Sequence, residues 1–280
     1  MRLRFEPFPE SDDLLNAVAD GSELLTLDLS DVQFVKPALL VGVAAIASAH
    51  RVRHGVPPQF VPPGLGDPRI YASRMSLGEV LSAEGVTQTG LDPVRHYDRH
   101  GQLCELRRFE SNSEAVDLVN LVQQRCDTAE YPYEAAEALT LSIWELADNC
   151  LAHAQVGHGF LAAQVLPQPT RSLHFAVADG GIGIRDSLAG TPHERHDDQS
   201  AIRAAVESRV TSVASLHGRA RGVGLSNLLE WVTATGGTLT IRSGGAAISF
   251  RRRAESAALE LVPSTVDRVD GTLVSGWIPC

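Results

Sequence analysis

A long run of helix-forming residues, EAAEALTLSIWELADNCLAHA from Glu134 to Ala154, constrains the fold of this chain most. One apolar stripe of this helix is expected to pack inward: Leu139, Ile143, Leu146, Cys150 and Leu151. Glu145, Asn149 and His153 follow one another at a spacing of four, so they share a second face. Because an unpaired buried polar group costs about 1 to 3 kcal/mol, this polar stripe favours a ligand, a metal or a polar neighbour. A solvated helix face would show the same spacing.

The net charge of −10 over 280 residues makes a broad nucleic-acid surface improbable, because such surfaces need clustered Lys and Arg. A small anionic ligand held by backbone amides and a few arginines remains compatible with this charge. No apolar run approaches the roughly 20 residues of a membrane span, and the N-terminus lacks an apolar signal segment. Four cysteines without CxxC spacing indicate reduced thiols. We therefore expect a cytoplasmic protein with no membrane partner.

The first hundred residues predict a small α/β domain. A strand is expected at 24–30, a helix at 37–52, a short extended piece at 59–61 and a second helix at 73–85. The polar stretch from Asp92 to Gly101 marks the boundary, so we predict domains at 1–100 and 101–280.

The second domain reads as two helices, two strands, a helix and three further strands. This order predicts a two-layer α/β sandwich with helices on one face of a mixed sheet. The expected ranges are helices at 113–126, 134–154 and 223–235, and strands at 160–166, 173–179, 238–243, 246–252 and 272–278.

Two glycine-rich segments follow the polar helix. In VADGGIGI (Val177 to Ile184) a strand ends at Asp179 and enters a turn that can bring its backbone against a flat ligand. In GRARGVGL (Gly218 to Leu225), Gly222 and Gly224 precede a helix whose first amides can hold an anion, with Arg219 and Arg221 beside them. Taken singly, a glycine-rich hairpin and a capped linker would look much the same.

Together these segments resemble the GHKL, or Bergerat-fold, ATP-binding superfamily. ELADN is similar to its N box, DGGIGI to its first glycine box, GVGL to its second, and Gly271-Thr272 to its final adenine-side strand. The resemblance covers roughly residues 113–280 and implies ATP and Mg²⁺ as ligands. It implies that Asn149 coordinates Mg²⁺, that Glu145 acts as general base, and that Asp179 reads the adenine amine.

The same resemblance implies further contacts. Thr272 would help to hold adenine, Gly181 and Gly183 would lie against the nucleotide, and the phosphates would meet Gly222, Gly224 and Arg221. The implied ATP site is completed by their neighbours His153, Ile184, Arg219, Val223 and Leu225. Residues 185–221 would form a mobile lid. Its tract HERHDD (193–198) allows a metal site, but a solvated loop is the simpler interpretation.

Within the superfamily, His153 stands where histidine kinases tend to carry Lys, and no dimerising helical hairpin precedes Ser113. This pattern is closer to the bacterial anti-sigma-factor serine kinases. Residues 24–55 are similar to STAS domains, the fold of the anti-sigma-factor antagonists. Those antagonists carry a phosphorylatable Ser at the start of the helix, where this chain reads Val35-Lys36-Pro37-Ala38. A STAS-like unit here would serve as a docking or dimerising surface, and a generic α/β domain would share its pattern.

The sequence thus predicts a bacterial regulatory protein that uses ATP·Mg to phosphorylate a Ser or Thr on a protein partner, or to gate partner binding. The partner would be an anti-sigma antagonist or another STAS protein, and a homodimer is compatible with the fold. The alternative is an ATP-hydrolysing or ATP-sensing conformational switch without kinase activity. A vestigial nucleotide site is a third hypothesis, against which the intact Glu145, Asn149 and Asp179 argue.

Overall fold

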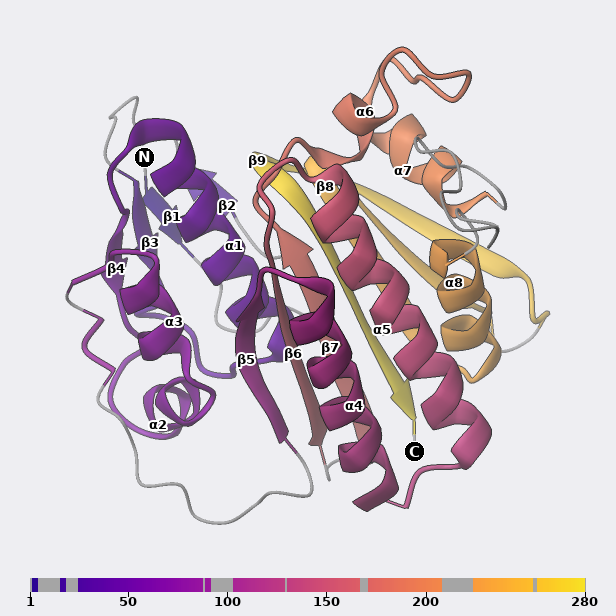
Figure 1. Cartoon of the computed structure of the whole chain (residues 1–280), viewed down its shortest axis with the longest axis horizontal. Coiled ribbons are helices and arrows are strands. Elements are labelled where there is room, and N and C mark those ends of the chain that lie inside the picture. Colours follow the sequence, from indigo (N-terminus) through magenta and orange to yellow (C-terminus); the bar gives the residue numbers. More distant parts are fainter. Residues whose placement is uncertain are drawn as a thin grey trace.

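Two β-sheets organise the chain in its computed structural model (Figure 1). The structure describes residues 2–4, 16–18, 25–87, 89–91, 103–128, 130–166, 171–207, 224–253 and 256–279. The predicted domain boundary at residues 100 and 101 lies outside these ranges. Mixed α/β structure, as predicted, is present on both sides of it.

The smaller sheet has the strand order β2-β1-β3-β4. Its strands are β1 (Arg2–Arg4), β2 (Asn16–Val18), β3 (Thr26–Asp28) and β4 (Gln59–Val61). β2 runs antiparallel to β1, whereas β1, β3 and β4 are parallel. Helix α1 (Pro37–His54) connects β3 to β4, as a parallel strand pair requires.

Helix α1 is buried along most of its length. It begins with Pro37 at the first helical turn, and it ends at Gly55, whose φ of 73° suits a glycine C-cap. Every residue from Pro37 to His50 is buried, which explains why the helix is apolar on all sides rather than on one stripe. The sequence prediction of a helix at 37–52 is confirmed.

The helix predicted at 73–85 is instead two short helices, α2 (Asp67–Arg74) and α3 (Leu77–Ala83). They are separated at Ser76, whose φ of 61° lies in the left-handed region. A right-handed helix cannot continue through a residue in that conformation, so the prediction of one helix was wrong.

The larger sheet has the strand order β5-β6-β7-β9-β8. It consists of β5 (Leu103–Phe109), β6 (Gly159–Leu166), β7 (Ser172–Asp179), β8 (Thr238–Arg252) and β9 (Leu259–Pro279). All four pairings are antiparallel, so the mixed sheet predicted from the sequence was wrong for this sheet. The physical reason is connection length, since β6–β7 and β8–β9 are joined by short segments that can link only antiparallel strands.

The strands predicted at 238–243 and 246–252 are one strand, β8, interrupted by a bulge at Ser243 to Ala246. Gly244 within the bulge has a φ of 62°, which glycine adopts without strain. The glycine pair at 244 and 245 suggested a turn between strands, but the chain bends there and continues to pair with β9.

Helices cover both faces of the larger sheet. Helices α4 (Asn112–Thr128), α5 (Tyr133–His153) and α8 (Gly224–Ala234) pack on one face, and α1 packs on the other (Figure 1). The prediction of helices on one face therefore holds for the second domain alone. Strand residues alternate accordingly, with Leu161 and Phe175 facing α5 and with Phe160 and Ala176 facing α1.

Between β7 and α8, the residues that the structure describes (180–207) include two short helices. They are α6 (Gly183–Ser187) and α7 (Asp198–Val206), and Figure 1 shows both at the end of the larger sheet far from the C-terminus. The search for membrane spans found no helix of suitable length and apolarity in the described ranges. The predicted cytoplasmic location stays a prediction.

Candidate functional site

A cleft opens where the C-terminal half of α5 meets the ends of β7 and β9 and the start of α8. It contains about 1030 Å³ of empty space, part of which is open to solvent. Nine of the residues predicted from the sequence line it: Glu145, Asn149, His153, Asp179, Gly183, Ile184, Gly224, Leu225 and Thr272. Segments separated by more than a hundred residues in the chain therefore meet in one hollow.

Helix α5 supplies one wall of the cleft. Glu145, Asn149 and His153 all line it, which confirms that their spacing places them on one helix face. Asn149 is exposed, whereas Glu145 and His153 are half-buried. The apolar stripe predicted for the same helix is buried at Leu139, Ile143, Leu146 and Cys150, and Leu151 is half-buried.

Asp179 is a buried carboxyl group at the end of β7, with 7% of its surface exposed. Its Oδ1 accepts a hydrogen bond from the Gly181 backbone N–H at 2.8 Å. Burial raises the pKa of Asp179 from 3.8 to about 6, and backbone hydrogen bonds from Gly181 and Thr272 partly oppose this rise. An acid kept in such a position is a candidate for ligand recognition.

The buried Cys150 thiol also lines the cleft. Burial and the nearby charge of Asp179 raise the pKa of this thiol well above its usual value. The thiol therefore stays protonated at neutral pH, and a cysteine nucleophile is not part of the site.

The turn from Gly180 to Gly183 is held against the end of α5. The Ile182 N–H donates to the Ala154 carbonyl oxygen at 3.2 Å. A Cβ atom on Gly181 would lie 1.9 Å from that same oxygen, so only glycine fits there. Although Gly181 is part of this turn, it lines a neighbouring cleft rather than this one.

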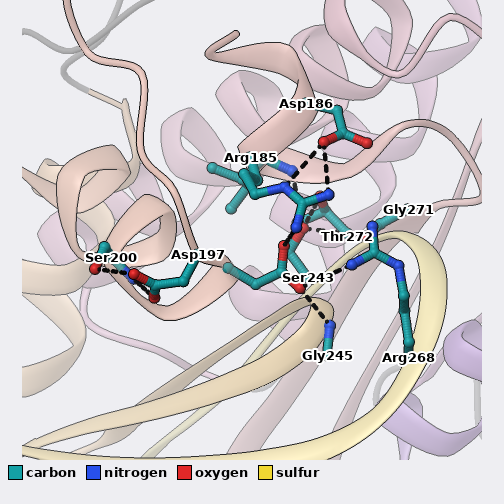
Figure 2. A network of polar contacts seen from close by, with 11 residues as sticks. Arg185, Asp186, Asp197, Ser200, Ser243, Gly245, Arg268, Gly271 and Thr272 are labelled. Atoms are coloured by element: carbon teal, nitrogen blue, oxygen red, sulfur yellow. Dashed lines mark hydrogen bonds and ion pairs between the residues drawn. The ribbon is translucent and has the colours of Figure 1, made fainter.

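Gly183 begins α6 with a φ of 78°, a backbone conformation that residues other than glycine rarely adopt. The next backbone N–H, that of Ile184, donates to the Ser243 hydroxyl oxygen at 2.8 Å. Ser243 Oγ also lies 3.3 Å from Thr272 Oγ1 and donates to the Gly271 carbonyl oxygen at 3.3 Å (Figure 2). Ser243 thus ties the glycine turn to the strand that carries Thr272.

Strand pairing places Thr272 directly opposite Asp179, since these two residues are partners in the β7–β9 ladder. The start of α8 completes the cleft with Gly224 and Leu225. A Cβ atom on Gly224 would lie 2.4 Å from Glu145 Cβ, so glycine lets the helix approach the acid closely. The predicted residues Arg219, Arg221, Gly222 and Val223 lie outside the described residues.

The predicted lid, residues 185–221, is described as far as Glu207 and contains most of α6 and all of α7. Asp198 fixes this segment to the larger sheet. Its Oδ2 accepts from the Gly245 N–H at 2.8 Å and lies 3.1 Å from Arg268 Nη1, while Oδ1 lies 3.3 Å from Arg185 Nη1. Figure 2 labels these three partners, Arg185, Arg268 and Gly245.

The HERHDD tract is more ordered than the solvated loop that the sequence suggested. No group of three or more metal-binding side chains occurs among the residues that the structure places. Asp197 caps α7 by accepting from the Ser200 N–H at 2.8 Å, and Asp198 makes the contacts above. The acids of this tract therefore hold α7 in place.

Several cleft residues were missed by the sequence analysis. Ser243, which supports the glycine turn without lining the cleft, belongs to an ordinary strand pattern, TLTIRS, and no sequence signal marks it. Most of the others are apolar or small and carry no chemical signature, while Asp148 is an acid within the ELADN motif to which no role was assigned. The unpredicted lining residues include Leu146, Asp148, Ala154, Val177, Ser187, Leu188, Ala205 and Val274.

Comparison with known proteins identified no family to which this cleft could be assigned. A scan against protein-family models matched no family. A search of curated proteins found no match. The case for a function therefore depends on the residues of the cleft.

Proposed function

We propose that this cleft binds ATP with Mg²⁺, and that the chain is a regulatory protein which transfers the γ-phosphoryl group to a Ser or Thr of a protein partner. One observation carries the proposal. The three acid-bearing and glycine-bearing segments that resemble the GHKL superfamily line a single cleft, together with Thr272. A chance resemblance of short motifs would not require them to meet.

The chemistry of the cleft fits an adenine nucleotide. The Asp179 carboxylate is buried at the end of a strand, where it can accept a hydrogen bond from an exocyclic amine. Thr272 lies beside it in the ladder and offers a hydroxyl group.

The donor set also fits Mg²⁺. This ion prefers oxygen ligands and usually takes only one or two from the protein, the rest coming from phosphates and water. Asn149 presents its amide to the cleft, with Glu145 on the same face. When bound, the ion would neutralise charge on the phosphate oxygens.

For phosphoryl transfer, Glu145 is the proposed general base. The acceptor hydroxyl oxygen forms a bond to the γ-phosphorus while the bond from that phosphorus to the β–γ bridging oxygen breaks. ADP leaves with the bonding electron pair, and Glu145 takes the hydroxyl proton. The backbone N–H groups at the start of α8, beside Glu145, would face the phosphates.

Titration with Mg·ATP, followed by incubation with γ-labelled ATP, tests this proposal. Asp179→Asn is expected to abolish binding, because the amide places a donor where the adenine amine needs an acceptor. Glu145→Ala is expected to retain binding within a few-fold and to lose transfer. Asp186→Asn, on the exposed side of α6, is a control that should bind as the wild type does. Unchanged affinity in Asp179→Asn would remove the adenine assignment.

A second candidate function is an ATP-driven conformational switch without a phosphorylated partner. It is favoured by the glycine turn itself, which contacts helices on both faces of the sheet, so that a ligand in the cleft could change their packing. Label transferred to a protein supports the kinase, release of inorganic phosphate alone supports an ATPase switch, and ATP binding without turnover supports a sensor.

The role of the N-terminal unit is part of the proposal. Its β3–α1–β4 order is compatible with the STAS resemblance. At the start of α1, Val35, Pro37 and Ala38 are buried and lack hydroxyl groups. This helix start is therefore not a phosphoacceptor, and we assign the acceptor hydroxyl to a separate partner protein.

A further inference from the structure

We infer that helix α1 positions the glycine turn of the cleft from the opposite face of the sheet, so that nucleotide affinity depends on how α1 is packed. This inference deepens the proposed function and rests on it. It concerns residues to which neither the sequence motifs nor the cleft lining assigns a role.

The closest contact is at Gly180, between Asp179 and Gly181. A Cβ atom built on Gly180 would lie 2.8 Å from the Ala45 carbonyl oxygen, 3.0 Å from Ala49 Cβ and 3.0 Å from Ala49 N. All three atoms belong to α1. The backbone of the turn therefore rests directly on the helix, and any displacement of α1 at this point is transmitted to Asp179 and Gly181.

A second contact joins α1 to the segment between α5 and β6. The Ser48 hydroxyl lies 2.7 Å from His158 Nε2, and His158 Nδ1 lies 2.9 Å from the Val156 carbonyl oxygen. Because Nδ1 faces a carbonyl, it carries the proton, and Nε2 accepts from Ser48. This pair holds α1 close to the end of α5, where Ala154 accepts from the glycine turn.

The third contact lies at the end of α1. Arg53 Nη1 is 2.8 Å from Asp270 Oδ2. Asp270 precedes Gly271 and Thr272, and a Cβ atom on Gly271 would lie 2.0 Å from the Asp179 carbonyl oxygen. Through these three contacts α1 packs against segments next to Asp179, Thr272 and the glycine turn. No residue of α1 lines the cleft itself.

The dependence is reciprocal. If the packing of α1 changes the affinity for ATP, ATP must stabilise the packing of α1 by the same factor. The N-terminal unit would then act as a built-in regulator of the cleft, and a partner that shifts α1 would change nucleotide occupancy.

Gly180→Ala tests the main contact, because the three atoms nearest to the added methyl group all belong to α1. Gly64→Ala is the matched control, since Gly64 also has no positive φ and its Cβ would meet only Ser30 O at 3.6 Å. We expect Gly180→Ala to raise the Kd for Mg·ATP about tenfold or more, and Gly64→Ala to change it less than about twofold.

Arg53→Gln tests the inference if Gly180→Ala does not fold. Its control is Arg251→Gln, which removes an ion pair with Glu260 of the same 2.8 Å length and similar exposure, far from the turn. Exposed ion pairs contribute little, so we expect a rise in Kd of about two- to fivefold for Arg53→Gln and none for its control.

Hydrogen exchange supplies the reciprocal readout. Mg·ATP is expected to slow amide exchange in α1 of the wild type, and to slow it less in Gly180→Ala. Wild-type ATP affinity in both Gly180→Ala and Arg53→Gln, with no protection of α1, would overturn this inference and leave the proposed function intact. A wild-type protein that binds no ATP would overturn both.

Discussion

The two faces of the larger sheet differ in what their residues contribute. On the α1 face, the strands present fully buried apolar side chains such as Phe160 and Ala176 to an apolar helix. On the α5 face, the apolar packing stops at one end, where Asp179, Glu145 and Asn149 surround a cleft. The apolar contacts of the α1 face add to stability, whereas the α5 face gives up stability at the place where a ligand would bind.

This difference shows which part of the sheet can bury a polar side chain. A carboxyl group at 7% exposure is unfavourable unless its neighbours or a ligand compensate for its burial. The comparison can be tested by substitutions that act on one face only.

The largest effect is expected on the α1 face. Phe160→Ala removes a side chain with no exposed surface between β6 and α1. We expect the free energy of unfolding to fall by about 3 to 5 kcal/mol in a denaturant titration. Phe34→Ala, at 45% exposure, is the control and should cost far less.

The shape of the same titration also tests whether the two faces belong to one cooperative unit. The cluster that contains Phe160 joins α1 to β6, β7 and β9, so we expect a single unfolding transition. Two separate transitions would show that the N-terminal unit unfolds alone, and the comparison of faces would then be one between independent domains.

The elements best predicted from the sequence were those with long, regular patterns. Helix α5 and strands β6 and β7 were placed within about two residues, because helical spacing and continuous apolar runs depend only on neighbouring residues. The meeting of Glu145, Asn149 and Asp179 followed from the motif resemblance. The structure places these three residues in one cleft. Whether the cleft binds ATP is a question for experiment.

The elements that the sequence missed depend on contacts between distant residues. Helix α7 depends on the Asp197 cap and on Asp198, whose partners lie on α6, β8 and β9. The position of α1 behind the cleft depends on Gly180, which looked like one more turn glycine. No local pattern reveals either arrangement, because each is decided by which surface the segment meets after folding.

An intermediate effect on the free energy of unfolding is expected at the buried Asp179 in the cleft. In the ligand-free protein the pKa of Asp179 is raised from 3.8 to about 6, so the folded state binds its proton more tightly than the unfolded chain. The carboxyl group therefore lowers stability as the pH rises from about 4 to above 6. That difference in pKa corresponds to about 3 kcal/mol at pH 7.5, so Asp179→Asn should stabilise the ligand-free protein by up to that amount.

Thermal melts at pH 4 and pH 7.5 measure this effect. The stabilisation by Asp179→Asn should be near zero at pH 4 and largest at pH 7.5. Asp197→Asn is a control of opposite sign, because hydrogen bonds from Ser200 lower the pKa of Asp197 and its charge caps α7. A variant Asp179→Asn that is less stable than the wild type at pH 7.5 would show that the buried acid is structural and would break the contrast between the faces.

The smallest effect is expected at Asp198, whose polar contacts join α7 to α6, β8 and β9. Asp198→Asn keeps an oxygen for the Gly245 N–H but loses the charge attraction to Arg185 and Arg268. Global stability should fall by about 1 kcal/mol or less, since both arginines are partly exposed. Amide exchange in α7 should nevertheless become faster, because these contacts join α7 to its neighbours and their loss favours local opening of the segment. Asp186→Asn removes only an exposed partner of Arg185 and should leave exchange in α7 unchanged. Equal exchange in both variants would mean that the apolar contacts of Ile202 and Ala201, rather than Asp198, hold α7 to the sheet, and that the two faces are stabilised in the same way.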